Sequence, residues 1–326
     1  MLYHGGRLRE AVVRYGIAPS DWLDLSTGIN PYGWPVPSVP ADVWTRLPDE
    51  DELAEIAITY YSAKYLLPVA GSQVAIQQLP LLRSSCRVGV LTPGYGEHAH
   101  AWRSGGHEVV PISADDIGGQ LSRFDVLVLS NPNNPTGGCF PPEQLLAWHR
   151  QLASRGGWLI VDEAFIDMTP GESLAPYSIR PGLIVLRSFG KFFGLAGVRA
   201  GFVCAAAELL SRLESRLGPW AVSGPARWVA SAALQDRQWQ VAMRCRLATQ
   251  GTRLRALLTR HGLPPDGGCA LFQWHRTPYA RQLQEQLATD GILIRRFDHP
   301  SSVRFGLPGE EADWQRFDSA LNGIRL

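Results

Sequence analysis

The chain has 326 residues, of which 45% are hydrophobic and 19% are charged, enough for two ordinary globular domains with a substantial core. Lysine and arginine together number 31 against 30 acidic residues, which argues against a general nucleic-acid or membrane-surface binder. The sequence shows no signal peptide and no apolar run long enough to cross a bilayer. The five cysteines form no CxxC pair, which predicts free thiols in a reducing cytoplasm and no zinc site.

Short apolar runs alternate with amphipathic or loop segments between about residues 86 and 204. Most are rich in Val, Ile or Leu, as buried parallel strands are. This pattern predicts an α/β fold with a mostly parallel sheet covered by helices, in which ligands bind beyond the carboxyl ends of the strands. The predicted strands are Arg87–Leu91, Glu108–Ile112, 124–129, 158–161, 183–186 and Gly201–Cys204, with a helix at Pro142–Ala153.

The character of the sequence changes after about residue 205. Two long amphipathic helices are predicted there, followed by a smaller α+β arrangement of the segments 270–274, 279–290, 292–297 and 303–307. Residues 1–45 hold many Pro, Gly and Trp residues and predict an ordered arm. We therefore predict an N-terminal arm at 1–45 that is part of a small domain, a large cofactor-binding domain at 46–204, and the C-terminal small domain with its linking helix at 205–326.

The most specific motif directly follows the predicted strand at 183–186 and runs from Ser188 through Lys191 to Arg199, rich in Phe and Gly. Lys191 can bond covalently to an aldehyde, and Ser188 and Arg199 can hold a phosphate. Ser188-x-x-Lys191 also matches the nucleophile motif of penicillin-binding proteins, but the sequence lacks the Lys-Thr-Gly and Ser-Asp-Asn partners of that motif. The motif therefore predicts an aldehyde-binding lysine beside a phosphate site.

Other polar residues follow the neighbouring predicted strands. Asp162 can hold a protonated pyridine nitrogen, and Asn134 can donate to a phenolic oxygen. Tyr95 can stack on the face of a ring. A phosphate is also favoured by the free N–H groups at the start of a helix, and such a start is predicted at Gly71, Ser72 and Gln73.

Taken in order, these motifs resemble the pyridoxal-5′-phosphate (PLP) enzymes of the aminotransferase class I/II superfamily, fold type I. They read Gly-Ser-Gln, Pro-x-Tyr, Asn-Pro-x-Asn-Pro-Thr-Gly, Asp-Glu-Ala-Phe and Ser-x-x-Lys-x-x-Gly-Leu-Ala-Gly-x-Arg, and they span residues 71–201. The resemblance implies an aspartate-aminotransferase-like fold, with a large domain built on a mostly parallel, seven-stranded type of sheet between helices and a small α+β domain. It also implies a homodimer with sites at the subunit interface.

By this resemblance, Lys191 is the Schiff-base lysine and Asp162 pairs with the pyridine nitrogen. The other implied cofactor-binding residues are Gly71, Ser72, Gln73, Tyr95, Asn134, Phe165, Ser188 and Arg199. Arg304 matches the arginine that binds the substrate carboxylate, and further candidate substrate ligands are His4, Asn30 and Arg295. No metal is expected, because the His98 and His100 pair lacks a third ligand at a suitable spacing, and these side chains are expected to line a helix start beside the site.

Two branches of the superfamily fit the sequence, histidinol-phosphate aminotransferase and the threonine-phosphate decarboxylase-like proteins of cobalamin biosynthesis. The second is favoured by the opening Tyr3-His4-Gly5-Gly6, by Ile29-Asn30-Pro31, and by Phe165, where the first branch usually has a tyrosine. The resemblance therefore implies decarboxylation of L-threonine O-3-phosphate to (R)-1-amino-2-propanol phosphate. An aminotransferase acting on similar phosphate-bearing substrates and a non-catalytic protein of this fold are the alternatives.

Two features depart from the pattern of the superfamily. Arg46-Leu47-Pro48-Asp49 stands where Tyr-Pro-Asp is usual, and that tyrosine reaches a phosphate in the site of the other subunit. Leu47 cannot make this contact, so either another group replaces it or phosphate binding is weaker. The C-terminal arginines are also more closely spaced than usual, so Arg295 is either a substrate ligand or part of a solvated strand edge.

Overall fold

The computed structural model describes residues 4–48 and 51–325, which form two compact units. Tyr3 and Asp49, which belong to two of the sequence motifs, lie outside the described residues. The larger unit comprises residues 33–134 and 139–240, and the smaller unit comprises the remaining N-terminal, 135–138 and C-terminal segments. The domain boundaries drawn from the sequence, after residues 45 and 204, stay a prediction.

The larger unit is built on a seven-stranded sheet with the strand order β2-β8-β7-β6-β5-β3-β4. Of the strands described in this sheet, β8 alone runs opposite to the other six. The strands are β2 (Leu66–Val69), β3 (Arg87–Leu91), β4 (Glu108–Ile112), β5 (Val126–Ser130), β6 (Trp158–Asp162), β7 (Leu183–Ser188) and β8 (Gly201–Cys204). The mostly parallel α/β fold expected from the sequence is thus confirmed.

The buried character of the central strands explains why the sequence predicted them well. Every residue of β5 and β6 is buried, as is typical of parallel strands that have helices on both faces. Val126 of β5, Ile160 of β6 and Leu186 of β7 belong to one hydrophobic core, together with Trp102. The edge strand β2 was not predicted, because it has only four residues and one of them is a proline, which is unusual inside a strand.

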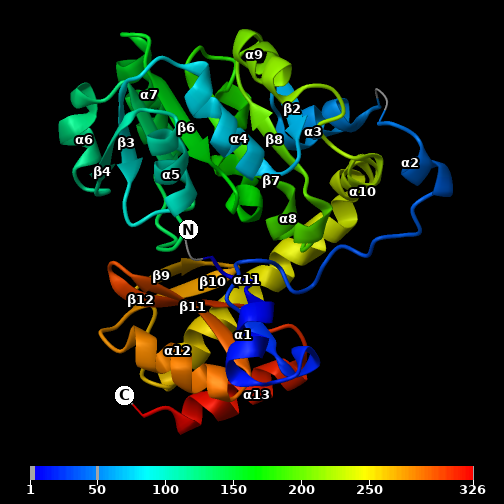
Figure 1. The fold of residues 1–326 in the computed structure, drawn as a ribbon, viewed down its shortest axis with the longest axis vertical. Helices are drawn as coiled ribbons and strands as arrows, with labels where there is room; N and C mark the ends of the chain where they lie inside the picture. Colours follow the sequence, from blue (N-terminus) through cyan, green and yellow to red (C-terminus); the bar gives the residue numbers. More distant parts are fainter. Residues whose placement is uncertain (1–3, 49–50, 326) are drawn as a thin grey trace. The chain divides into compact units, whose positions relative to one another are not determined.

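Helices flank this sheet, and Figure 1 shows α4 and α5 in front of it. The helices of the larger unit are α2 (Ala41–Thr45), α3 (Leu53–Tyr61), α4 (Ser72–Gln78), α5 (Gly96–Ser104), α6 (Ile117–Gln120), α7 (Pro142–Ala153), α8 (Phe189–Phe192), α9 (Ala207–Leu217) and α10 (Gly224–Gln235). The long helix α11 (Arg237–Arg260) begins in this unit and continues into the smaller one.

The smaller unit has a five-stranded sheet with the order β1-β11-β12-β10-β9. Strand β1 pairs in parallel with β11, so residues from both ends of the chain form one sheet. Its elements besides α11 are α1 (Leu8–Tyr15), β1 (Leu23–Leu25), β9 (Gly267–Cys269), β10 (Phe272–Arg276), α12 (Ala280–Thr289), β11 (Ile292–Asp298), β12 (Ser301–Gly306) and α13 (Glu311–Gly323). Within the ranges that the structure describes, no helix is long and apolar enough to cross a membrane.

Candidate active site

Four neighbouring parallel strands, β7, β6, β5 and β3, end at the same edge of the large sheet. A pocket of about 130 Å³ lies there, far more than the roughly 10–15 Å³ that one water molecule needs. It is lined by Ser72, Gln73, Tyr95, Ser130, Asn134, Asp162, Ala164, Phe165, Ser188, Gly190, Lys191, Ala196 and Arg199. The strand ends therefore place the motif residues in one cavity, as a parallel sheet requires.

Nine of the ten residues predicted to bind the cofactor line this pocket, the exception being Gly71. Ser130, Ala164, Gly190 and Ala196 also line the pocket, although no role was predicted for them. Each of these residues lies within or directly beside one of the sequence motifs, so its position next to the motif residues could have predicted it.

Gly71 shapes the pocket through its backbone. Its φ is +80°, which favours glycine, and a Cβ atom there would lie 2.5 Å from an Arg199 guanidinium nitrogen. Arg199 itself has φ of 56° and ψ of 47°, a left-handed conformation that is uncommon for a residue with a side chain. Such a conformation costs on the order of 1–3 kcal/mol and tends to occur at functional sites. The close approach brings the Arg199 side chain over the start of α4, where backbone N–H groups are available for an anion.

Asp162, the last residue of β6, is held by two hydrogen-bonding partners. Its Oδ2 lies 2.9 Å from Nε2 of the buried His98, and its Oδ1 accepts a hydrogen bond of 3.2 Å from the backbone N–H of Ala164. His98 follows Tyr95 by three residues, about one helical turn, so the two side chains are neighbours at the start of α5. From this position the His98 ring contacts Asp162. The sequence placed His98 beside the site, but this contact with Asp162 was not foreseen.

The turn after β5 is fixed by amide side chains. Asn131 accepts a hydrogen bond of 2.8 Å from the Phe140 N–H and donates to the Phe140 carbonyl oxygen. Asn133 donates to the carbonyl oxygen of Pro93, which belongs to the turn after β3. The Asn133 bond joins the turns after β5 and β3, and the Asn131 bonds fix the turn after β5 itself. Together they hold Asn134 at the pocket wall.

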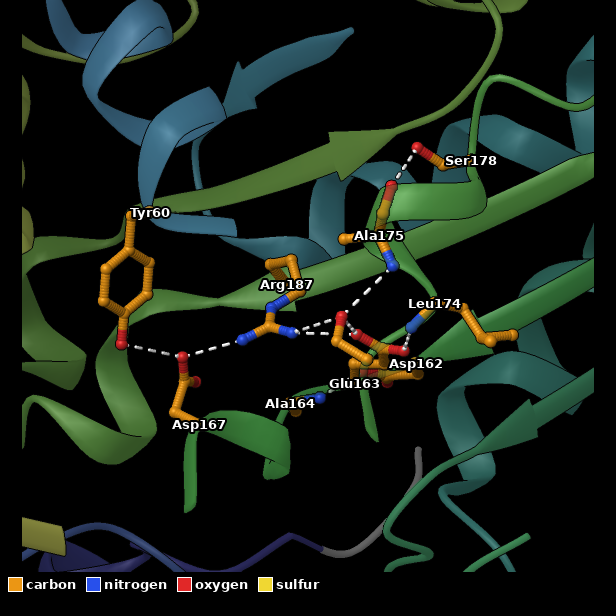
Figure 2. A network of polar contacts seen from close by, with 10 residues as sticks. Tyr60, Asp162, Glu163, Ala164, Asp167, Leu174, Ala175, Ser178 and Arg187 are labelled. Carbon is orange, nitrogen blue, oxygen red and sulfur yellow. Dashed lines mark hydrogen bonds and ion pairs between the residues drawn. The ribbon is translucent and has the colours of Figure 1, made fainter. Parts of the chain in front are cut away.

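A buried polar network lies next to the pocket residues on β6 and β7. Figure 2 shows Arg187 between Asp167 and Glu163, with Tyr60 beyond Asp167. The Arg187 guanidinium donates to Asp167 at 2.7 Å and to Glu163 at 2.8 Å, and the Tyr60 hydroxyl donates to Asp167 at 3.1 Å. Because Glu163 follows Asp162 and Arg187 precedes Ser188, the network fixes the backbone that carries two pocket residues.

The charges of this network are strongly perturbed. Burial raises the pKa of the Glu163 carboxyl, and Arg187 with the backbone N–H of Leu174 only partly offsets that effect. Burial lowers the pKa of Arg187, but Asp167 and Glu163 outweigh it, so that the arginine pKa is raised overall. Arg187 is only 1% exposed and Glu163 is 0% exposed. This network was not predicted from the sequence: Arg187 in the apolar run of β7 indicates that a buried partner exists but does not identify it.

The four candidate substrate ligands lie in the smaller unit. His4 and Arg295 lie around one small recess there together with Ser26, and this recess has no room for a water molecule. Arg304 donates to the carbonyl oxygen of Ser26 at 2.9 Å and stands opposite Arg295 in the β11–β12 ladder. Asn30 is buried, and its side chain makes hydrogen bonds to the backbone N–H and carbonyl of Tyr32, a local turn.

The donors of the pocket suit a small phosphorylated ring with an aldehyde. Lys191 supplies an amine, Asp162 a carboxylate, and Arg199 with the first turn of α4 an anion site. The same set does not suit a metal, and over residues 4–48 and 51–325 no group of three or more His, Cys, Asp or Glu side chains could hold one.

Comparison with known proteins places the chain in a family. The family described as "Aminotransferase class I and II" matches residues 21–320. A threonine-phosphate decarboxylase of Pseudomonas aeruginosa is 56% identical over all of this chain and 98% of its own length. A histidinol-phosphate aminotransferase of Streptomyces avermitilis is 31% identical over 72% of this chain and 66% of its own.

Solved structures support the same fold. The histidinol-phosphate aminotransferase of Sinorhizobium meliloti, solved in complex with pyridoxal-5′-phosphate, superposes with a TM-score of 0.87 at 21% identity and covers 99% of this chain and 95% of that one. The family match over nearly the whole length agrees with the resemblance of the sequence motifs and with the seven-stranded sheet. The chain belongs to the aminotransferase class I and II family.

Proposed function

We propose that the protein is a PLP-dependent lyase that converts L-threonine O-3-phosphate to (R)-1-amino-2-propanol phosphate and carbon dioxide in cobalamin biosynthesis. The observation that carries this proposal is the 56% identity, over the full chain, to an enzyme named threonine-phosphate decarboxylase. The pocket geometry is consistent with it, because Lys191, Asp162 and Arg199 face one cavity.

In the proposed site, the Lys191 amine would hold the cofactor through its aldehyde, and the Asp162 carboxylate would accept a hydrogen bond from the ring N–H. Arg199, Ser72, Ser188 and the N–H groups at the start of α4 hold the phosphate, with Gln73 contributing its backbone N–H. Asn134 donates to the ring oxygen, Tyr95 covers a ring face, and Phe165 contributes an apolar wall. What PLP supplies when bound is a cationic ring that withdraws electrons from the substrate Cα.

The residues of this chain decide which bond to Cα breaks. The orientation in which these residues would hold the substrate carboxylate and the Cα hydrogen would select between decarboxylation and transamination. Loss of carbon dioxide leaves an electron pair that a proton must quench at Cα. The Lys191 Nζ, which lines the pocket, is the group that we assign to deliver that proton.

Arg304 and Arg295 remain our candidates for the anionic groups of the substrate. Like charges directly opposite each other in a ladder are destabilising, so an arginine pair on one face of the sheet favours a bound anion. His4 lies at the same narrow recess as Arg295 and is a further candidate. Asn30 is a less favoured candidate, because its side-chain amide already forms hydrogen bonds within the local turn. Arg304→Met is expected to raise KM for the phosphorylated amino acid at least about tenfold, with a smaller effect on cofactor affinity.

We also propose that the protein is a cytoplasmic homodimer. The larger unit exposes an apolar groove of about 920 Å³, whose lining includes the exposed side chains of Val36, Trp44, Leu47 and Trp220. Exposed apolar surface of this kind is typical of an interface. Arg199 lines both the groove and the pocket, so a partner seated on the groove would adjoin the cofactor site. The mass in solution, by light scattering, tests this point, and a monomer would contradict it.

The experiment that tests the proposed reaction is an absorbance spectrum of the purified protein, before and after addition of L-threonine O-3-phosphate, with carbon dioxide measured in parallel. We expect a visible band that shifts, and release of carbon dioxide without a keto acid. A band that bleaches and recovers only with 2-oxoglutarate would instead identify an aminotransferase. A bound cofactor with no turnover of either kind would favour a non-catalytic role.

Asp162 and His98 give a further prediction. Asp162→Asn is expected to lower turnover about 10²-fold or more, because an amide does not stabilise the protonated ring nitrogen. His98→Gln keeps a hydrogen-bonding side chain toward Asp162 and should cost less than His98→Leu, which leaves the carboxylate with one fewer partner. The measurement is turnover as a function of pH, and equal effects of the two His98 variants would contradict a role through Asp162.

A further inference from the structure

Three side chains at the first turns of α4 and α5 form a chain of hydrogen bonds. The Tyr95 hydroxyl donates to Oε1 of Gln73 at 3.2 Å, and Nε2 of Gln73 donates to Oε2 of Glu97 at 2.8 Å. Tyr95 and Gln73 both line the pocket, and all three side chains are partly buried. We call these residues the Tyr95–Gln73–Glu97 relay.

The direction of the relay follows from the chemistry of its ends. An ionised carboxylate accepts hydrogen bonds but cannot donate them, so the Gln73 NH₂ group must face Glu97. The Gln73 carbonyl oxygen therefore faces Tyr95, and it can only accept. The tyrosine hydroxyl is consequently the donor, and its one proton is committed to the protein.

We propose that Gln73 is a positioning residue, which fixes the Tyr95 ring relative to the anion site at the start of α4. This inference rests on the proposed function, in which the ring covers the face of PLP. A tyrosine held only at its Cβ can change rotamer, whereas a bond at the far end of the ring gives it a second fixed point. Because the Gln73 side chain is used in this way, its contribution to the phosphate is its backbone N–H, one of the free donors of the first helical turn.

The relay makes two parts of the cofactor site depend on each other. Gln73 belongs to the helix whose N-terminus lies under Arg199, and Tyr95 directly precedes α5. A shift of α4 would therefore move the Tyr95 hydroxyl with it. The hydroxyl, rather than only the aromatic ring, is thus part of the binding site, although it is not available to donate a proton to the reaction.

The test is a double-mutant cycle on the affinity of the full-length apoprotein for PLP, read from the visible absorbance and circular dichroism on titration. Gln73→Met keeps the length of the side chain and the backbone N–H, and Tyr95→Phe keeps the ring. Each single substitution is expected to weaken binding about fivefold to tenfold and to change the visible dichroism. Adding Tyr95→Phe to Gln73→Met is expected to weaken binding by less than about twofold more, because the bond that it removes is already lost.

Controls separate this role from a general loss of structure. Gln77→Met, at an exposed position of the same helix, should leave affinity and dichroism unchanged. Glu97→Gln keeps an acceptor and should bind close to the wild-type protein, whereas Glu97→Leu should resemble Gln73→Met. Additive effects in the cycle, or a Gln73→Met variant with wild-type affinity and dichroism, would overturn the relay alone. A wild-type protein that does not bind PLP would overturn the proposed function and the relay together.

Discussion

Replacing Lys191 with alanine is expected to lower turnover by at least about 10³-fold while leaving the fold intact. Lys191 lies in the short helix α8 and supplies the amine of the pocket lining, so the variant loses both the covalent attachment of the cofactor and the proposed proton carrier at Cα. Positioned acid–base groups alone contribute about 10²–10⁴-fold. The residue is only partly buried, and its truncation leaves the aromatic side chains of Phe189 and Phe192 in the core.

The small number of lysines allows the site of cofactor attachment to be identified directly. Lys64 is the only other lysine in the chain, and it is exposed. Reduction of the holoenzyme with borohydride, followed by peptide mass spectrometry, should place the cofactor on Lys191 and leave Lys64 unmodified. Lys64→Ala serves as the matched control and should keep wild-type turnover. Retained turnover in Lys191→Ala, or a label on Lys64, would contradict the assignment.

The pocket was predictable because its residues are encoded by contiguous motifs that follow buried strands. Asp162, Asn134 and Lys191 each come within five residues of the end of an apolar run, and parallel strands place such residues at one edge of the sheet. The clustering of these residues could be predicted without knowing the order of the strands. It depends only on the strands being parallel, which their uniformly apolar sequences indicated.

Contacts between segments far apart in the sequence were less accessible. The hydrogen bonds from His98 to Asp162 and from Gln73 to Glu97 depend on the rotation and depth of α4 and α5 against the sheet. Hydrophobic patterning defines the buried face of a helix but not which polar side chain meets which partner at its end. Arg187 was missed for a related reason, because one charge in the buried run of β7 gives no sign of the residues that neutralise it.

Arg187→Met is expected to destabilise the protein by about 3–5 kcal/mol, the typical effect of removing one member of a buried ion pair. The substitution preserves much of the volume but leaves Glu163 and Asp167 buried without the guanidinium that bonds both. The measurement is chemical unfolding of the apoprotein. Arg103→Met, at an exposed position of α5, is the control and should change stability by less than about 0.5 kcal/mol.

The loss of stability in Arg187→Met should change with pH, and ionisation of the Glu163 carboxyl determines whether it grows or shrinks. Burial already raises the pKa of Glu163, and Arg187 is the largest influence that lowers it, so the substitution raises this pKa further. A carboxyl whose pKa is higher in the folded than in the unfolded state favours folding at low pH, and stability is lost as the pH rises through its folded pKa. The deficit of Arg187→Met should therefore be smaller near pH 5 than near pH 8. Glu163→Gln and Asp167→Asn, added to Arg187→Met, should recover much of the loss at pH 8, because no buried carboxylate is then left unpaired. A deficit that is the same at both pH values and is unaffected by these additions would show that packing, rather than charge, explains the role of Arg187.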